Sequence, residues 1–459
     1  FPWSTGNFSS LKLLDLRFCG FWGKVPHAIS NFTRLQFLFL GFNNFSGDLL
    51  GSIGNLRSLE AIYMSKCNFS GQITSSLRNL TELVVLDMAQ NSYGGTIELD
   101  VLLTSWKKLE VLALSSNRLS VLTKATSNTT SQKIQYIGLR SCNLTKFPNF
   151  LENQRDMVVL DLSDNRIKGK VPKWLLDPNM QNLSALNLSH NLLTGFDQHP
   201  VLLPGNNGDA VTFDLSSNNL QGPLPVPPSG TANYVASNSS LTGAIPSWIC
   251  NLNTLESLVL SHNNFSGLLP QCLGNFSNVL SVLDLQGNNF SGTIPNTFIK
   301  ERRIPSSLGD LSKLLHLDLS INELLGELPV SVGNLHSLKE LDLSANFLSS
   351  EWPISIGNLS SLKELDLSQN NFFGELPISI GNLGSLKELD LSQNGFFGEL
   401  PTSIRNLFSL EKLDLSFNKF LGEFPWSSGN FSSLKLLDLR SCGFWGKVPH
   451  AIKFGVEQF

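Results

Sequence analysis

A column of aspartates is the feature of this sequence with the most evident chemical potential. The phrase Leu-Asp-Leu-Ser or a close variant places one carboxylate at a fixed interval, at Asp318, Asp342, Asp366, Asp390, Asp414 and Asp438. Stacked carboxylates can bind divalent cations or share a proton. Lysines flank the same phrases, at Lys339, Lys363, Lys387 and Lys412. Their positive charges favour the simpler interpretation, a solvated face of mixed charge.

No other combination of residues predicts chemistry. The seven histidines are scattered without an H-x-x-x-H pair, and the chain has no G-x-S-x-G, P-loop, dinucleotide-binding, C-x-x-C or kinase motif. We therefore expect no enzyme activity, no cofactor and no metal site. A net charge of −4, a pI near 6.0 and the lack of basic clusters interleaved with aromatics argue against nucleic-acid binding.

The aspartates belong to a repeat that extends along the chain. Its clearest form is L-x-x-L-x-x-L-D-L-S-x-N-x-F-x-G-x-L-P-x-S-I-G-N, with a period of 24 residues. The L-x-L pair alternates with period two and predicts a short strand with buried leucines. The Asn marks a tight corner, the next Phe or Leu fills the core, and Gly permits a bend. Pro then ends sheet pairing, and stacking of turns builds one continuous core.

Eighteen strand cores follow this pattern. Regular cores centre on Leu14, Leu38, Ile62 and Leu86, and again on Leu317, Leu341, Leu365, Leu389, Leu413 and Leu437. Less regular cores centre on Leu112, Ile137, Leu160, Leu186, Phe213, Tyr234, Leu258 and Leu283. A repeat of this length and composition predicts an α/β solenoid in which each turn contacts only its neighbours.

The Gly after Asn-x-Phe/Leu and the Pro shortly afterwards resemble the plant leucine-rich-repeat receptor-like proteins, the class that contains many disease-resistance and elicitor receptors. The resemblance covers nearly the whole chain. Irregular phrases carry it most specifically: Thr96–Asp100, Ser141–Pro148, Leu192–Gln198 and Gly222–Pro228. It implies a right-handed superhelix, with short parallel strands on the concave face and loops and 3-10 turns on the convex face. It also implies an extracellular position at the plasma membrane and membrane receptor kinases as signalling partners.

The order of the repeats is broken in one place and duplicated in another. Residues 424–452 repeat residues 1–29 with only two differences, and Ile294-Pro295 and Ile304-Pro305 lie ten residues apart with no strand core between them. We therefore divide the chain into repeats at 1–300 with twelve cores and an irregular middle, a truncated junction at 301–312, repeats at 313–452 with six regular cores, and a non-repeat tail at 453–459. The expected origin is a rearranged ectodomain piece, without the signal peptide, caps and membrane helix of the family.

The six cysteines fall into two groups. Cys19, Cys67, Cys142 and Cys442 occupy the corner position of the Asn, where we expect buried thiols. Cys250 and Cys272 lie on the predicted convex side of consecutive turns. Because stacked strands are about 5 Å apart, we expect these two to lie within disulfide reach.

Fifteen N-x-S/T sequons occur in the sequence, and many arise from the repeat phrase Asn-Asn-Phe-Ser-Gly itself. The second Asn of that phrase is expected to point outward, where a glycan could be attached. The candidates for glycosylation are Asn44, Asn68, Asn128, Asn238, Asn264 and Asn289.

Ligand binding is the most plausible function, because the variable residues of each strand form a continuous surface. In the first turns these positions carry aromatic and basic residues, which are common at interface hot spots. The candidates are Arg17, Phe18, Phe37, Phe39, Phe42, Tyr63, Lys66 and Arg140. The competing explanation is packing between adjacent exposed rings.

The sequence thus predicts the ligand-recognition scaffold of a plant cell-surface receptor-like protein, in defence or developmental signalling, with a peptide, protein or glycan as ligand. Three alternatives remain at this stage: the ectodomain of a leucine-rich-repeat receptor kinase, a secreted inhibitor-type binding protein, and a non-functional duplicate.

Overall fold

The computed structural model describes residues 8–123, 133–176, 182–197, 211–227, 230–275, 279–294, 313–425 and 431–447. The chain forms two compact units, one comprising residues 1–220 and 225–231 and the other residues 221–224 and 232–459. The predicted junction at 301–312 and the tail at 453–459 lie outside the described residues. The same holds for Asn128 among the glycosylation candidates.

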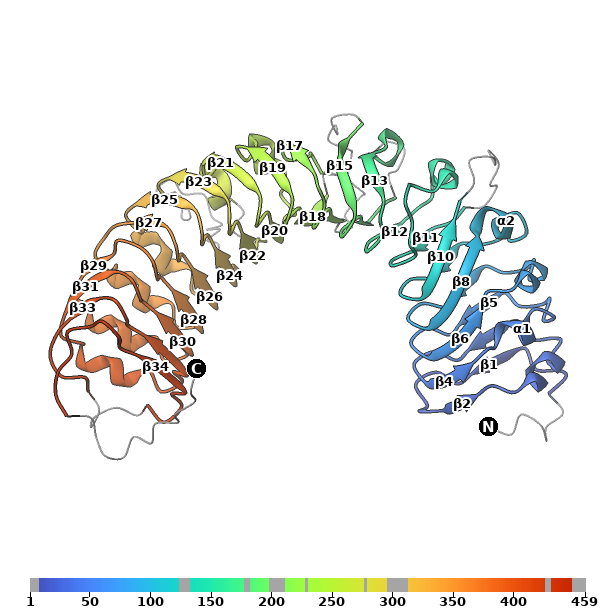
Figure 1. Cartoon of the computed structure of the whole chain (residues 1–459), viewed down its shortest axis with the longest axis horizontal. Helices are drawn as coiled ribbons and strands as arrows, with labels where there is room; N and C mark the ends of the chain where they lie inside the picture. The colour runs from blue at the N-terminus through green and yellow to red at the C-terminus, as the bar shows by residue number, and fades with distance from the viewer. Residues whose placement is uncertain are drawn as a thin grey trace, which may run out of the picture. The chain divides into compact units, whose positions relative to one another are not determined.

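Parallel strands of three to five residues form one face of each unit (Figure 1). We call this the strand face. In the first unit it consists of β1 (Leu13–Asp15), β3 (Phe37–Phe39), β5 (Ala61–Tyr63), β7 (Val85–Asp87), β9 (Val111–Ala113), β11 (Tyr136–Gly138), β12 (Val159–Asp161), β14 (Ala185–Asn187) and β16 (Val211–Asp214). In the second unit it consists of β18 (Thr231–Val235), β20 (Ser257–Val259), β22 (Val282–Asp284), β24 (His316–Asp318), β26 (Glu340–Asp342), β28 (Glu364–Asp366), β30 (Glu388–Asp390), β32 (Lys412–Asp414) and β34 (Leu436–Asp438).

Each of the eighteen predicted strand cores lies in one of these strands. The register is regular: Leu38 pairs with Leu14 on one side and Ile62 on the other, and Leu365 pairs with Leu341 and Leu389. The central residue of nearly every strand is buried, whereas its two neighbours point outward. The solenoid class that the sequence predicts is therefore confirmed.

A second row of short strands follows the corners. In the first unit these are β2 (Trp22–Lys24), β4 (Asn44–Gly47), β6 (Asn68–Gln72), β8 (Ser92–Glu98), β10 (Arg118–Leu122), β13 (Lys168–Val171) and β15 (Leu192–Phe196). In the second unit they are β17 (Gln221–Gly222), β19 (Ser240–Gly243), β21 (Asn264–Leu268), β23 (Asn289–Gly292), β25 (Glu323–Gly326), β27 (Phe347–Leu348), β29 (Phe373–Gly374), β31 (Gly395–Gly398) and β33 (Lys419–Phe420). We call this side of each unit the lateral face.

Short helices complete the turns opposite the strand face. They are η1 (His27–Asn31), α1 (Leu50–Ile53), η2 (Ser75–Asn79), α2 (Leu99–Leu103), η3 (Asn149–Asn153) and η4 (Lys173–Leu176), followed by η5 (Ser247–Asn251), η6 (Gln271–Asn275), η8 (Val330–Asn334), η9 (Ile354–Asn358), η10 (Ile378–Asn382) and η11 (Thr402–Asn406). Nine of these 3-10 helices directly follow a proline, such as Pro353 before η9. Proline's fixed φ and missing N–H are compatible with the residue just before a helix but not with a sheet interior.

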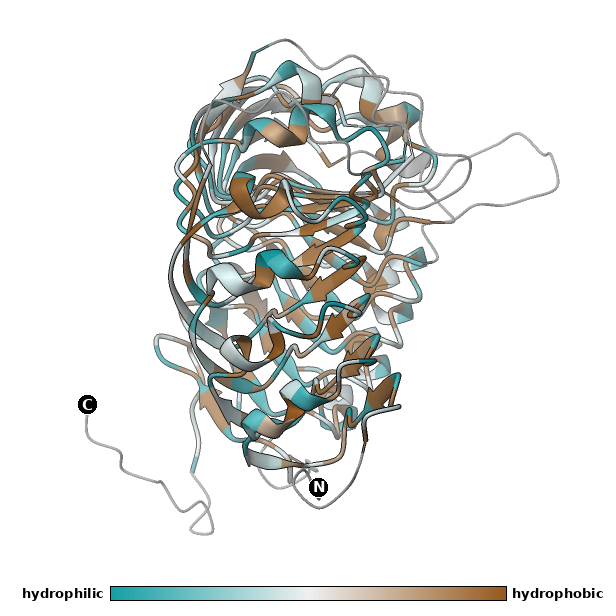
Figure 2. Cartoon of the chain, turned by 90° about the vertical axis from the view of Figure 1, so that its right-hand side faces the viewer, coloured by the Kyte–Doolittle hydropathy of each residue, from teal (hydrophilic) through white to brown (hydrophobic). Residues whose placement is uncertain are grey.

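Two ladders stabilise the interior. The corner Asn263 is buried, and its Nδ2 lies 2.8 Å from the Ala236 carbonyl of the preceding turn, while its Oδ1 accepts from the Leu241 N–H at 3.0 Å. Buried rings stack beside the corners, as in Phe372–Phe396 and Phe396–Phe420, each with ring centroids 6.2 Å apart. Figure 2 shows hydrophobic segments recurring from turn to turn. Burial of such a ring contributes about 2 kcal/mol per turn.

Candidate functional site

The aromatic candidates of the first turns lie together on the strand face of the first unit. Phe37 and Phe39 are the two outward residues of β3, and Tyr63 is the outward residue opposite Phe39 on β5. The ring centroids of Phe39 and Tyr63 are 5.0 Å apart in an edge-to-face arrangement, and those of Phe37 and Phe39 are 6.3 Å apart. All three side chains are half-buried. They form a continuous aromatic surface that keeps one side open to solvent.

Three corner residues extend this surface. Phe18, Phe42 and Lys66 have φ angles of 56°, 58° and 54°, because the corner of each turn uses the left-handed region. The rings of Phe18 and Phe42 stack with centroids 4.3 Å apart, and the Lys66 ammonium lies 4.8 Å from the Phe42 ring centroid. Phe18 is 70% exposed and Phe42 is 41% exposed. The corner therefore displays these side chains although the backbone there is unfavourable for them.

Arg17 contacts both an aromatic ring and a carboxylate. Its guanidinium lies 4.8 Å from the Phe39 ring centroid and makes an ion pair with Asp15 at 2.7 Å. The side-chain hydrogen bond from Arg17 lowers the pKa of Asp15 below its usual range. The carboxylate therefore stays ionised and pairs with the guanidinium beside the ring, at a distance that favours cation–π attraction.

We call Arg17, Phe18, Phe37, Phe39, Phe42, Tyr63 and Lys66 the aromatic–basic cluster. The structure brings these seven candidates together across three consecutive turns. It leaves Arg140 apart, in the turn of β11, where its guanidinium pairs with Asp164 at 2.6 Å. Ring-to-ring packing explains part of the contacts, yet two of the rings and both cations remain substantially exposed.

The strand face of the second unit is acidic. Glu340, Glu364 and Glu388 lie in register beside Asp342, Asp366 and Asp390 on β26, β28 and β30. Together with His316, Asp318 and Lys412 they line a hollow of about 280 Å³. Among the described residues, two pairs offset this negative charge: His316–Glu340 at 2.6 Å, when the histidine is protonated, and Lys412–Asp390 at 3.3 Å.

The expectation of a solvated face of mixed charge holds only in part: Lys412 pairs with Asp390 on this face, whereas the outward residues of β26, β28 and β30 are all acidic. Burial raises the pKa of Asp366 to about 6, against the hydrogen bonds donated by Ser368, and the neighbouring Asp342 and Asp390 add to the rise. Lys339 and Lys363 precede their strands by one residue, and neither makes an ion pair with the aspartate column in the described part of the chain. The missed signal was the Glu two residues before each Asp, which period-two geometry places on the same face.

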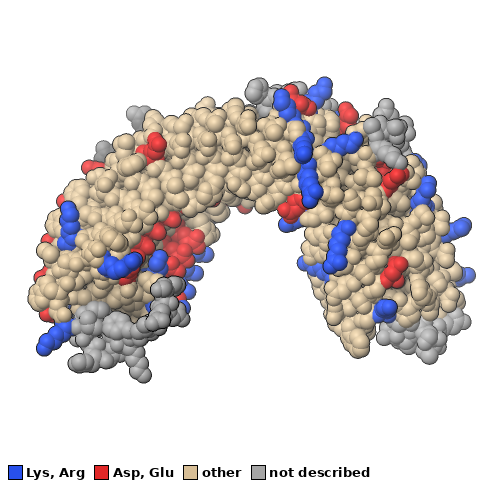
Figure 3. All heavy atoms as spheres, viewed as in Figure 1, with Lys and Arg blue, Asp and Glu red and all other residues tan. Residues whose placement is uncertain are grey.

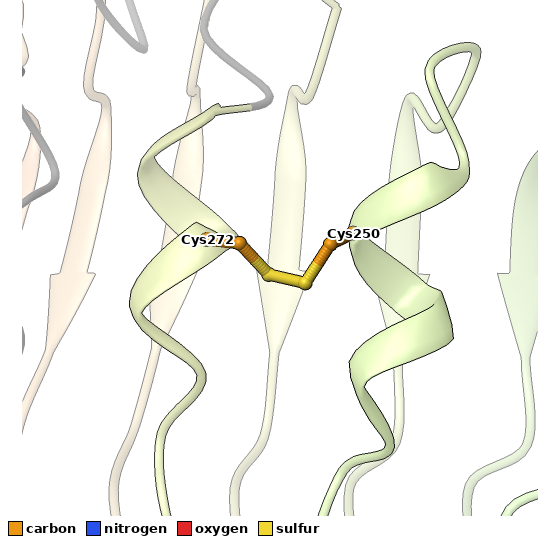
Figure 4. The surroundings of a disulfide bond; sticks show 2 residues. All are labelled: Cys250 and Cys272. Carbon is orange, nitrogen blue, oxygen red and sulfur yellow. A yellow bond between two sulfur atoms is a disulfide. The ribbon is translucent and has the colours of Figure 1, made fainter.

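The cysteines occupy two kinds of position. Cys250 on η5 and Cys272 on η6 form a disulfide between consecutive turns, with a Cα–Cα distance of 5.7 Å (Figure 4). Among the corner thiols, Cys67 and Cys142 are buried, and burial raises the pKa of Cys142 to about 12. The expectation of burial is wrong for Cys19, because no described turn packs on that side of it.

The described glycosylation candidates are exposed. Asn44, Asn68, Asn264 and Asn289 lie at the start of β4, β6, β21 and β23, and Asn238 occupies a left-handed corner. Asn68 also donates a hydrogen bond to Asn44 in the neighbouring turn. Their occupancy by glycans stays a prediction.

Metal sites and membrane-spanning helices were assessed only for the part of the chain that the structure describes. No group of three or more His, Cys, Asp and Glu side chains in that part of the chain has a geometry that could hold a metal ion. None of its helices is long and apolar enough to cross a membrane.

Comparison with known proteins places this repeat in a family. Residues 254–395 match the model of a leucine-rich repeat region, and residues 10–32, 58–80, 385–407 and 409–431 match the Leucine Rich Repeat model. Receptor-like protein 7 from Arabidopsis thaliana is 41% identical over 170 residues, which cover 37% of this chain and 17% of that protein. Receptor-like protein 6 from the same plant is 37% identical over 210 residues, covering 46% and 21%.

Solved structures show the same fold. The ectodomain of the Arabidopsis receptor kinase HAESA, determined with the peptide hormone IDA and the co-receptor SERK1, superposes with a TM-score of 0.76 at 30% identity, covering 96% of this chain and 71% of that one. The plant peptide hormone receptor RGFR1, in complex with RGF2, gives a TM-score of 0.66 at 27% identity, covering 96% and 76%.

The chain is therefore a leucine-rich-repeat protein. Its repeats are similar to those of plant receptor-like proteins. The matches span about a fifth of the length of Receptor-like proteins 6 and 7.

Proposed function

We propose that this chain is a ligand-recognition scaffold of an extracellular plant receptor, and that the aromatic–basic cluster is its recognition surface. The carrying observation is the exposure of stacked Phe18 and Phe42 beside Lys66 at the corners that border the strand face. Exposed aromatic and Arg side chains on a preorganised surface bind with little loss of conformational entropy. The role is binding and not catalysis.

The ligand class that this surface fits is a peptide with aromatic and acidic residues. The rings of Phe37, Phe39 and Tyr63 offer area for stacking, and the cations of Arg17 and Lys66 attract carboxylates. The HAESA and RGFR1 receptors were each determined in complex with a peptide hormone or peptide ligand, IDA and RGF2. Their likeness to this chain supports a peptide over a glycan.

The proposed partner for signalling is a membrane receptor kinase, and the proposed location is the extracellular side of the plasma membrane. Support comes from the receptor-like relatives and from the co-receptor in the HAESA complex. Defence and developmental signalling both remain within this proposal, because the cluster specifies a ligand chemistry and not a pathway.

Selection from a displayed random peptide library tests the proposal. The wild-type chain serves as bait, and the variant with Phe37→Ser, Phe39→Ser and Tyr63→Ser serves for counter-selection. We expect enrichment of aromatic–acidic sequences that bind wild type and not the variant. The proposal fails if no sequence discriminates between the two proteins while circular dichroism shows both folded.

A further inference from the structure

The lateral face of the second unit carries an exposed apolar row. Several turns elsewhere place serine after the buried ring of the lateral strand, as at Ser46, Ser70, Ser266 and Ser291, whereas the first turn has Trp22 there, 81% exposed. The last turns have apolar residues at the equivalent position: Leu325, Phe373, Phe397, Leu421 and Trp445, which are 49%, 44%, 44%, 56% and 65% exposed. Ser349 interrupts the row, and the exposed Phe347 lies opposite Leu325 there.

The same substitutions remove glycosylation signals. In the other turns the serine completes Asn-Phe-Ser, the sequon of Asn44, Asn68, Asn264 and Asn289. In Asn371-Phe372-Phe373 the second Phe replaces that serine. The lateral strands β25 to β33 therefore carry no N-x-S/T sequon. At the position where turns such as those of Asn264 and Asn289 have the serine of a sequon, most of these strands have an exposed apolar side chain.

A row of glutamates accompanies the apolar row. Glu327, Glu351, Glu375, Glu399 and Glu423 are all exposed, and none makes an ion pair within the described part of the chain. Glu351 is bridged in register to Phe373, and Glu423 to Trp445. A Cβ added at Gly398 would lie 2.7 Å from Cγ of Glu375, and one added at Gly422 would lie 2.9 Å from Cγ of Glu399. Four of the glutamates, Glu351, Glu375, Glu399 and Glu423, therefore lie across the glycine of the next turn, beside that turn's exposed apolar side chain.

We call these two rows together the acidic–apolar strip. Lys419, opposite Phe397, is a basic residue within it. The chemistry that fits the strip is a matching row of Arg and Lys, whose alkyl stems cover the rings while their charged ends meet the carboxylates. The chain already uses this combination: Arg17 lies over Phe39 while paired with Asp15, and Arg440 lies over Phe417 while paired with Asp438.

The first unit presents such a row on its own lateral face. The basic row consists of exposed side chains from the three consecutive turns of β9, β11 and β12: Arg118, Lys146, Arg166, Lys168 and Lys170. No ion pair holds any of them within the described residues. Figure 3 shows basic side chains following one another over the region of β13. The glutamates recur once per turn, about 5 Å apart, and the basic side chains come from three turns of the same spacing, three of them from the turn of β12, so the two patches have complementary charge over a similar length.

We propose that the acidic–apolar strip is a self-association surface, and that it binds the basic row of a second copy of this chain. The inference is independent of the proposed ligand site, because it uses the lateral faces and not the strand faces. Two different patches meet, so the contact is heterologous and extends into a ring or a linear array. Because both patches are exposed and charged, the association weakens as salt increases.

Charge exchange between two variants tests this pairing by sedimentation velocity. The first variant carries Glu375→Lys and Glu399→Lys, and the second carries Lys168→Glu and Lys170→Glu. Each has two surfaces of like charge, so each alone should show a dissociation constant at least about tenfold higher than wild type. Mixed in equal amounts, they should form a heterodimer, because the intact strip of the second variant meets the intact basic row of the first.

Apolar variants complete the test. Phe397→Ser with Leu421→Ser should weaken association, whereas Leu268→Ser, which changes a 67% exposed leucine outside the strip, should leave it unchanged. Circular dichroism confirms that each variant is folded. The proposal is overturned if the wild-type chain sediments as a monomer up to about 100 µM at low salt. A dissociation constant above that concentration would be too weak for a specific interface. It is equally overturned if the single charge variants associate as wild type does, or if their mixture stays monomeric.

Discussion

The strand faces of the two units are built from one repeat and carry opposite chemistry. In the first turns of the first unit the outward positions hold Phe, Tyr, Arg and Lys, which contact one another across strands. In β26 to β30 the same positions hold Glu and Asp, and in β24 they hold His316 and Asp318. Burial raises the pKa of three of these aspartates, Asp318, Asp342 and Asp366. The repeat fixes where outward side chains lie, and their chemistry is free to vary. One scaffold can therefore present an aromatic and basic surface in one unit and a surface of clustered carboxylates in the other.

The largest expected difference between the two strand faces is the effect of their variants on ligand affinity. For a peptide selected on the wild-type chain, the triple variant Phe37→Ser, Phe39→Ser and Tyr63→Ser should weaken binding by about 100-fold, since three stacking contacts are lost. The matched control is Glu340→Gln, Glu364→Gln and Glu388→Gln on the acidic face, which should change affinity less than about threefold. Isothermal titration calorimetry measures both. An equal loss in the two triple variants would contradict the difference between the faces.

Stability should respond to pH in opposite directions at the two faces. The folded pKa of Asp366 is about 6, above its ordinary 3.8, so its folded form prefers the proton and stability is lost as pH rises from about 4 to 6. Asp366→Asn should therefore raise the unfolding free energy at pH 7 by about 2 kcal/mol. Asp15, whose pKa is lowered by Arg17, contributes stability above its unfolded pKa, and this is lost as pH falls.

Urea unfolding at pH 5 and pH 7 measures these effects. The Asp366→Asn gain should shrink at pH 5, and Asp15→Asn should destabilise slightly at pH 7. A gain from Asp366→Asn that is independent of pH would show that desolvation of its charge is not the cause.

A smaller effect should distinguish the two copies of the duplicated segment. Arg17 and Arg440 occur in the same local sequence and pair with Asp15 and Asp438 in the same way. Each arginine lies near one ring, Arg17 at 4.8 Å from Phe39 and Arg440 at 5.9 Å from Phe417, but Ser441 replaces the corner Phe18 in the second copy. Arg17→Met should weaken peptide binding by about fivefold, the size of one cation–π contact. Arg440→Met should leave affinity unchanged, and a loss in that variant would place ligand contacts in the second unit.

The smallest expected effect concerns the corner thiols. Cys19 is exposed, whereas burial raises the pKa of the Cys67 thiol and shields it. Maleimide should label Cys19 rapidly in the folded chain and Cys67 only after unfolding. Cys19→Ser should change stability by less than about 0.5 kcal/mol. Mass spectrometry of tryptic fragments distinguishes the two sites, and fast labelling of Cys67 would show that its corner opens.

Much of the fold was predictable because the repeat is periodic. The Leu-x-Leu spacing located every strand core, the corner Asn located the ladder, and proline located most of the short helices. Period-two geometry also placed Phe37, Phe39 and Tyr63 on one face. The burial of the corner thiols was harder to predict, because it depends on the turns stacked on each side. Cys67 has a described turn on both sides, whereas Cys19 lies in the first described turn.

Electrostatics was the other difficulty. Lys339 and Lys363 are adjacent to the acidic strands in sequence, yet they precede those strands and do not pair with the aspartate column. A charge two residues before the Asp lies on the same face as the Asp, whereas a charge three residues before it lies outside the strand. Arg140 was grouped with the aromatic cluster from its period alone, whereas an intervening stretch of turns and the ion pair with Asp164 separate it.

Hydrogen–deuterium exchange with a selected peptide bound tests most directly which face recognises the ligand. The account predicts that peptide binding protects backbone amides from Phe18 to Lys66 and leaves β26 to β30 unchanged. Protection confined to β26, β28 and β30 would contradict it and assign recognition to the acidic face.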